Sequence, residues 1–99
     1  MRTAELFAAF ADAKFALRAL AQSMARELGP KGVHVAHVLI DGPIDMPWIR
    51  ENFAEMVKSR TADGLLASDA IAENYWSLHG QARSAWTHEL DQRPWVEKF

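Results

Sequence analysis

The sequence contains no cysteine, and only five glycines and four prolines among its 99 residues. The lack of cysteine excludes disulfides and cysteine-ligated zinc, and it favours a cytoplasmic setting. No uninterrupted apolar run approaches the roughly 20 residues that span a bilayer, and no such run follows Met1 and Arg2 as it would in a signal peptide. We therefore expect no membrane partner.

The chain also has no excess of basic charge. Its formal net charge is −2 and its pI is about 6.0, which gives no electrostatic basis for binding nucleic acid. Apolar residues make up 49% of the chain and charged residues 24%, as is ordinary for a globular protein. We expect residues 1–99 to form a single domain. Because so small a domain buries a low fraction of its surface, its size also favours a partner chain.

Residues 4–28 are predicted to form a helix, because good helix formers dominate the segment. Apolar residues recur at the helical spacing, namely Phe10, Leu17, Leu20, Met24 and Leu28. A second strip holds small residues that allow close approach, namely Ala9, Ala13, Ala16, Ala19 and Ala25. Gly29 and Pro30 are expected to end the helix.

Residues 33–40 are rich in β-branched side chains and nearly continuously apolar, which is typical of a buried parallel strand. Residues 41–47 are predicted to be a loop, followed by a helix from Pro47 to about Arg60 and a loop at residues 61–64. Ser68 is expected to cap a further helix that ends at Gly80. Residues 85–90 are predicted to form a short strand, and residues 93–99 an irregular tail.

Three motifs in this order resemble the short-chain dehydrogenase/reductase family. Residues 10–14 (FADAK) are similar to its Tyr-x-x-x-Lys motif. Residues 20–35 (LAQSMARELGPKGVHV) resemble the helix, turn and sixth strand that follow that motif. Residues 41–47 (DGPIDMP) resemble the Pro-Gly-x-Val/Ile-x-Thr-Pro loop beside the nicotinamide. The resemblance covers nearly the whole chain and implies the C-terminal part of a Rossmann-like, doubly wound α/β fold, with its last helices and one or two strands.

Several family features have no counterpart in this sequence. Nothing matches the Gly-rich loop that holds the dinucleotide pyrophosphate, the residue that reads the ribose, or the catalytic Ser. The resemblance thus implies a truncated oxidoreductase-like chain that is inactive alone. It also implies NAD or NADP as the cofactor of the full-length family, without choosing between them, and no cofactor bound by this chain.

Lys14 matches the catalytic Lys of the family, which hydrogen-bonds the nicotinamide ribose and lowers the pKa of the Tyr. The other interpretation of Lys14 is a surface lysine. Phe10 stands at the Tyr position and has no hydroxyl, so it cannot act as a general acid or base. Phe10 is more simply read as a core residue. The chain's only tyrosine, Tyr75, lies on a later predicted helix.

Gly42 and Ile44 match the loop positions where the backbone of the family contacts the nicotinamide carboxamide. Asp41 replaces the usual Pro, and Met46 replaces the usual Thr, so one hydroxyl contact is lost. The resemblance therefore predicts Lys14, Gly42 and Ile44 as cofactor-binding positions. A plain strand-to-helix loop is the alternative.

The histidines and tryptophans carry weaker predictions. His34 and His37 are three apart on a predicted strand and point to opposite faces, so no histidine spacing suggests a metal site. The tryptophans could line a substrate pocket, although core or interface positions are the commoner roles, and they are Trp48, Trp76, Trp86 and Trp95.

Two functional interpretations remain open. The first is a piece of a nicotinamide-dependent oxidoreductase. The second is a non-catalytic interaction module that associates with itself. In both, a strand from the middle of a sheet has open edges, and in the resembled family the long helix packs against its two-fold mate. We therefore expect a homodimer or higher oligomer.

Overall fold

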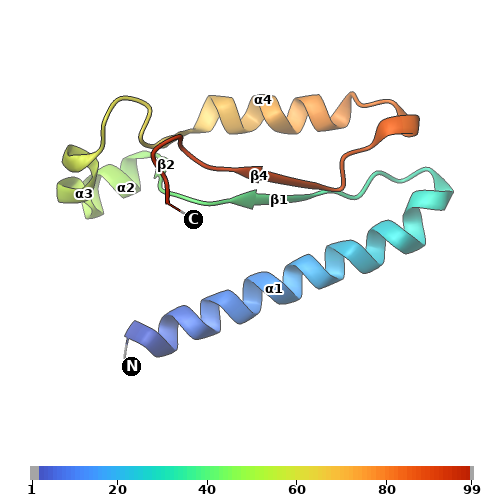
Figure 1. The fold of residues 1–99 in the computed structure, drawn as a ribbon, viewed down its shortest axis with the longest axis horizontal. Helices are drawn as coiled ribbons and strands as arrows, with labels where there is room; N and C mark the ends of the chain where they lie inside the picture. Colours follow the sequence, from blue (N-terminus) through green and yellow to red (C-terminus); the bar gives the residue numbers. More distant parts are fainter. Residues whose placement is uncertain (1–2, 99) are drawn as a thin grey trace.

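The computed structural model describes residues 3–98, and the side chains of residues 8–98 (Figure 1). A long first helix leads through a 3₁₀ turn into a mixed region of short strands and helices. The elements in chain order are α1 (Thr3–Leu28), η1 (Gly29–Lys31), β1 (His37–Ile40), β2 (Ile44–Asp45), α2 (Pro47–Asn52), α3 (Ala54–Ser59), β3 (Leu66–Ala67), α4 (Ser68–His79), η2 (Arg83–Ala85) and β4 (Glu89–Gln92).

Helix α1 and its termination follow the prediction. The helix ends at Leu28, and Pro30 lies in the 3₁₀ turn that follows. Gly32 closes this turn with a φ of 87°, a left-handed conformation that glycine adopts without a Cβ penalty. The backbone N–H of Val33 then donates to the carbonyl of Leu28 at 3.2 Å, which directs the chain back along the helix.

The central feature is a pair of parallel strands, β1 and β4, in which His37 is opposite Glu89 and Ile40 is opposite Gln92. In Figure 1 the pair lies between α4 and α1. A second parallel pair, β2 with β3, aligns Ile44 with Leu66. Parallel strands with helices on either side are the arrangement of a partial Rossmann-like α/β fold, as predicted.

The first strand is shorter and less buried than predicted. Only His37–Ile40 pairs with β4, whereas the prediction began at residue 33. The residues of β1 are half-buried, except Ile40, which is exposed to 39%. The strand is not fully buried because it has one strand neighbour among the described residues and one open edge.

The helices after β1 differ from the prediction in two places. The segment from Pro47 divides into α2 and α3 at Phe53, whose φ of −129° and ψ of 41° lie outside the helical region. Helix α4 is capped by Ala67, with no side-chain hydrogen bond, so Ser68 is not its N-cap. The Ser68 hydroxyl donates instead to the carbonyl of Asp45, which joins the start of α4 to the end of β2. Gly80 ends α4 as predicted.

The final strand is also displaced from its predicted place. Strand β4 spans Glu89–Gln92 instead of residues 85–90, and Arg83–Ala85 forms a 3₁₀ turn. Gln81 organises this turn, because its carboxamide receives a hydrogen bond from the backbone N–H of Thr87 and donates one to the Thr87 hydroxyl. These contacts delay the strand by several residues.

The described part of the chain has a small core. Its Cα radius of gyration is 16.2 Å, whereas a compact domain of about 100 residues has one of about 13 Å. The buried apolar side chains are Leu66 and Leu78. Every described side chain from residue 8 to residue 20 of α1 is exposed. The fold therefore leaves much of its apolar surface without a covering layer.

Candidate functional site

One cavity of about 540 Å³ lies between the first half of α1 and β1, and it continues into the loop after β1. It contains all four of the positions that the motifs singled out, namely Phe10, Lys14, Gly42 and Ile44. The rest of its lining comes from Leu17, the four residues of β1, Asp41 and Tyr75. The structure thus brings together motif positions that are up to 34 positions apart in the sequence, from Phe10 to Ile44, and adds Tyr75, which is 65 positions after Phe10. Their role in binding a cofactor stays a prediction.

Lys14 and Phe10 interact directly on one face of α1. They lie one helical turn apart, and the Lys14 Nζ is 5.3 Å from the centre of the Phe10 ring. A cation at this distance from a ring face is attracted by the ring's quadrupole. Phe10 is exposed to 62%, so its interpretation as a core residue is wrong. The arrangement keeps a positive charge at the cavity and places a phenyl ring, instead of a phenol, one helical turn before it.

Gly42 turns the chain at the carboxyl end of β1. Its φ is 133°, in the region that favours glycine. A Cβ at this position would lie 2.8 Å from the Cδ of Pro94, so the C-terminal tail packs directly on the glycine. On the other side of the loop, the carbonyl of Pro43 accepts a hydrogen bond from the Leu66 N–H at 2.8 Å. The loop is therefore held by the tail and by β3.

His37 gives the cavity an unpaired polar group. Its Nδ1 is buried and has no hydrogen-bond partner among the described residues. Buried polar atoms normally have a partner, so an unsatisfied one calls for an explanation. The nearby His34, which precedes β1, is satisfied, with its Nε2 2.8 Å from the Thr87 carbonyl. His37 therefore differs from His34 in having a buried ring nitrogen without a hydrogen-bond partner among the described residues.

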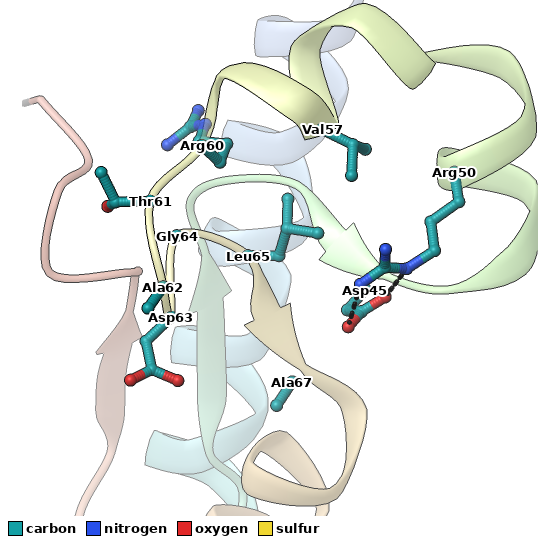
Figure 2. Close-up of a pocket in the computed structure, with 10 residues that line it drawn as sticks. All are labelled: Asp45, Arg50, Val57, Arg60, Thr61, Ala62, Asp63, Gly64, Leu65 and Ala67. Atoms are coloured by element: carbon teal, nitrogen blue, oxygen red, sulfur yellow. Dashed lines mark hydrogen bonds and ion pairs between the residues drawn. The ribbon is translucent and has the colours of Figure 1, made fainter.

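A second, more polar cavity of about 330 Å³ lies under the loop between α3 and β3 (Figure 2). Asp45 and Arg50 form a two-point ion pair at its edge, with Nε–Oδ1 at 2.6 Å and Nη2–Oδ2 at 3.0 Å. The hydrogen bonds from Arg50 hold the pKa of the Asp45 carboxyl below its ordinary value, and the same contact raises the pKa of Arg50. The pair ties α2 to β2.

The tail closes this region from the other side. Arg60, at the end of α3, pairs with Glu97 at 2.8 Å, and both side chains are less than a quarter exposed. The Trp95 indole N–H donates to the Ala62 carbonyl at 3.1 Å. Between these contacts, Asp63 adopts a left-handed φ of 58° beside Gly64. The tail thus packs against both the loop at residues 61–64 and the turn at Gly42.

The four tryptophans do not form one pocket. Trp86 stacks on His34 with ring centres 4.6 Å apart, and Trp48 tilts against Phe53. Trp76 and Trp95 are exposed to 75% and 74%. Within residues 3–98, no three acidic or histidine side chains gather in a group that could hold a metal ion. None of the helices in that range combines the length and apolarity needed to cross a membrane.

Sequence reasoning missed several members of both cavities. Tyr75 reaches the first cavity from α4, about 30 residues after the loop that it faces. Pro94 and the Asp45–Arg50 pair were also missed. The only sequence signal for the pair is that Asp45 and Arg50 lie on either side of the helix start at Pro47. Opposite charges at such a spacing are common on protein surfaces, so the signal is weak.

Comparison with known proteins shows which solved structure this chain is similar to. No family model matches the chain, and no curated protein matches it. A solved structure, the short-chain dehydrogenase from Rhodopseudomonas palustris, is 47% identical over 90% of this chain, with a TM-score of 0.59. The match covers 31% of that protein, so this chain spans about a third of its length. The resemblance to the C-terminal part of a short-chain dehydrogenase/reductase that the motifs indicated is thereby confirmed.

Proposed function

We propose that this chain is the nicotinamide-side portion of a short-chain dehydrogenase/reductase, and that it has no oxidoreductase activity by itself. The observation that carries the proposal is the single cavity shared by Phe10, Lys14, Gly42 and Ile44. Residues 1–99 would form one structural unit that supplies one side of a dinucleotide site. The remaining side would come from the part of such a protein that this chain does not match.

The residues of the cavity suit the nicotinamide end of NAD or NADP. Ligands of open parallel sheets bind outside the carboxyl ends of the strands, and Gly42 and Ile44 follow the carboxyl end of β1. The Lys14 ammonium supplies three donors for a ribose hydroxyl. When bound, the nicotinamide supplies hydride transfer. This chain would orient the ring through the loop backbone and place a positive charge beside the ribose.

Phe10 limits what the chain can add to the chemistry. Its ring has no proton to transfer, although Lys14 beside it could lower the pKa of a phenol. The sequence contains no Gly-rich loop for the pyrophosphate. We therefore propose binding and orientation of the nicotinamide as the contribution of this chain, with proton transfer absent.

A chimera tests the proposal directly. This chain would replace the matched third of the Rhodopseudomonas palustris short-chain dehydrogenase, and NADH and NADPH binding would be followed by nucleotide fluorescence. We expect the chimera to bind at least one nucleotide. The Lys14→Met variant should bind about tenfold more weakly, because a hydrogen bond from a charged group is lost.

The matched control is Lys58→Met, since Lys58 is also an exposed helical lysine but lies on α3, outside the cavity. Lys58→Met should leave the nucleotide affinity unchanged. Equal affinity of the Lys14→Met chimera and its parent would contradict the proposed role of Lys14. Failure of a folded chimera to bind either nucleotide would contradict the proposed function.

We also propose that the chain associates with itself through α1, as a homodimer or higher oligomer. Ala9, Ala13, Ala16 and Leu20 lie on one side of the helix, away from the cavity residues Phe10, Lys14 and Leu17. All four are exposed. A purely self-associating module would not need Lys14 and Gly42 at one cavity, so we favour the oxidoreductase-derived interpretation. A cytoplasmic location stays a prediction.

A further inference from the structure

Asp41 begins the 41–44 loop, and two different groups of this residue tie it to the C-terminal segment. Its backbone N–H donates to the carbonyl of Gln92 at 2.8 Å. Its carboxylate Oδ2 lies 2.9 Å from the Nη1 of Arg93, whose side chain is 18% exposed. Solvent therefore screens this ion pair less than it would at the open surface. The start of the loop is held through both its backbone and its side chain.

A proline at position 41 could make neither of these contacts. Proline has no backbone N–H and no carboxylate, and it stiffens a loop by fixing its own φ at about −65°. Residues 41–47 resemble a family motif that begins with Pro, and Asp41 replaces that residue. Aspartate leaves φ free, so a single loop conformation has to be held by contacts instead. The pairing of Asp41 with the C-terminal segment supplies such contacts.

The tail that follows Arg93 continues across the same loop. A Cβ on Gly42 would lie 2.8 Å from the Cδ of Pro94 and 3.4 Å from the Oε2 of Glu97. The same Glu97 oxygen accepts a hydrogen bond from the Nη1 of Arg60 at 2.8 Å. The tail is thus fixed at the end of α3, so it can hold the 41–44 loop from outside.

Arg93 is the cation at the centre of these contacts. Hydrogen bonds with Asp91 raise the pKa of its guanidinium, burial partly offsets the rise, and the charges of Asp91, Asp41 and Glu97 add to it. Asp91 belongs to β4, whereas Asp41 lies in the loop and Glu97 in the tail. One guanidinium therefore interacts with carboxylates from three segments, and its removal would leave their negative charges to repel one another.

We propose that Asp41 and Arg93 are positioning residues, and that their pairing lets the tail fix the 41–44 loop in place of the proline of the family motif. The consequence for nucleotide binding rests on the proposed function, in which Gly42 and Ile44 orient the nicotinamide. A loop with several conformations binds more weakly, because only the competent fraction binds. Loss of Arg93 should therefore weaken nucleotide binding, although Arg93 does not line the cavity.

The first measurement uses this chain without nucleotide. The Leu66 amide reports on the loop, because it donates to the carbonyl of Pro43 at 2.8 Å. Arg93→Gln should speed the hydrogen exchange of this amide about fivefold, because the loop loses its ion pair. Asp41→Pro fixes the loop without the tail, so in that background the effect of Arg93→Gln should fall to less than about twofold.

The second measurement uses the chimera with the Rhodopseudomonas palustris short-chain dehydrogenase. Arg93→Gln should weaken nucleotide binding about fivefold in the parent chimera and less than about twofold in the Asp41→Pro chimera. The matched control is Arg18→Gln, since Arg18 also pairs with a carboxylate of β4, that of Glu89, but lies outside the cavity. Arg18→Gln should change neither the nucleotide affinity nor the Leu66 exchange.

Equal effects of Arg93→Gln in the parent and Asp41→Pro backgrounds would overturn the proposal, because Arg93 would then act by a route other than Asp41. Unchanged affinity in a chimera that binds nucleotide would also contradict it. If the parent chimera binds no nucleotide, the proposed function fails, and the Leu66 exchange alone decides whether the pair holds the loop.

Circular dichroism of each variant verifies that it is folded. If Arg93→Gln does not fold, Asp41→Asn removes the same ion pair and keeps the backbone N–H that bonds to Gln92. Asp41→Asn should then speed the Leu66 exchange about fivefold. An exchange rate equal to that of the parent chain would show that the pair does not hold the loop.

Discussion

The Lys14 ammonium lies 5.3 Å from the centre of the Phe10 ring, so the cation that would stabilise a phenolate is paired with a hydrocarbon face. Phe10→Tyr should place a hydroxyl beside that cation. Because a nearby positive charge favours the ionised phenol, we expect the new tyrosine to titrate below the ordinary value of about 10. Ultraviolet difference absorbance against the parent chain, which contributes Tyr75, measures the midpoint.

Phe15→Tyr provides the comparison for this titration. Phe15 is also on α1 and is exposed to 65%, but it lies about 140° around the helix from Phe10. Its tyrosine should titrate at a higher pH than the one at residue 10. Equal midpoints for the two variants would mean that Lys14 does not act on the Phe10 position.

Gly42→Ala should destabilise the chain by about 1–3 kcal/mol, because alanine is strained at a φ of 133° and its Cβ would collide with Pro94. The free energy of unfolding in urea measures the loss. Gly29→Ala is the control, since a Cβ there meets nothing within 4 Å. Its effect should stay within about 0.5 kcal/mol. Similar losses for both variants would show that the tail does not pack on Gly42.

The Asp45–Arg50 ion pair predicts a pH dependence. The pKa of Asp45 is lowered in the folded chain, so the stabilisation is present above the unfolded pKa and is lost as the pH falls through the folded pKa. The side chains are exposed, so the effect on stability should be small. Carboxyl chemical shifts in an NMR titration locate the midpoint.

Removal of the partner tests the cause of this shift. Arg50→Gln should raise the Asp45 midpoint toward its ordinary value, because the substitution removes the positive charge of Arg50 and the hydrogen bonds from its guanidinium. Arg18→Gln removes a different ion pair, that with Glu89, and should leave the Asp45 midpoint unchanged. If Arg50→Gln left the Asp45 midpoint unchanged, the ion pair could not be the cause of the lowered pKa.

Arg60→Met should loosen the C-terminal tail. The Arg60–Glu97 pair is the more buried of the contacts near the second cavity, and its loss leaves Glu97 without that cation. We expect increased hydrogen exchange of the Glu97 amide, whose N–H bonds to the Pro94 carbonyl at 3.0 Å. Arg50→Met removes a cation from the same cavity without touching the tail, and it should leave this exchange rate unchanged.

Leu20→Glu should disrupt self-association through α1, because a carboxylate would replace an apolar side chain on the proposed surface. Light scattering over a concentration series should show at least a tenfold weaker association. Gln22→Glu adds a negative charge about 160° around the same helix, where we expect no effect. Unchanged association of Leu20→Glu would move the interface away from this side of α1.

Local sequence patterns predicted the elements that depend on few distant contacts. Helix α1 follows from its composition, and its end follows from Gly29, Pro30 and Gly32. The motifs also selected Lys14 and Gly42 before the structure placed them at one cavity. Lys14 and Gly42 belong to motifs of the resembled family, and these motifs can be recognised from the sequence alone.

Elements that depend on distant partners were not predicted. The extent of β1 is decided by β4, and the extent of β4 is shifted by the Gln81–Thr87 hydrogen bonds. The break between α2 and α3 at Phe53 occurs in the backbone dihedral angles of that residue, and no proline or glycine there signals it in the sequence. Tyr75 and Pro94 reach the candidate site through tertiary packing, which a linear pattern does not encode.

The parallel pairing of β1 with β4 has a consequence for how the chain acquires its structure. His37 meets Glu89, which lies 52 positions later, so closing this loop costs entropy before the pairing is gained. Contacts of such long range form slowly, whereas a helix forms within about a microsecond. During synthesis, β1 would therefore lack its strand partner until the β4 segment has emerged. This interval makes the newborn chain a candidate client for chaperones.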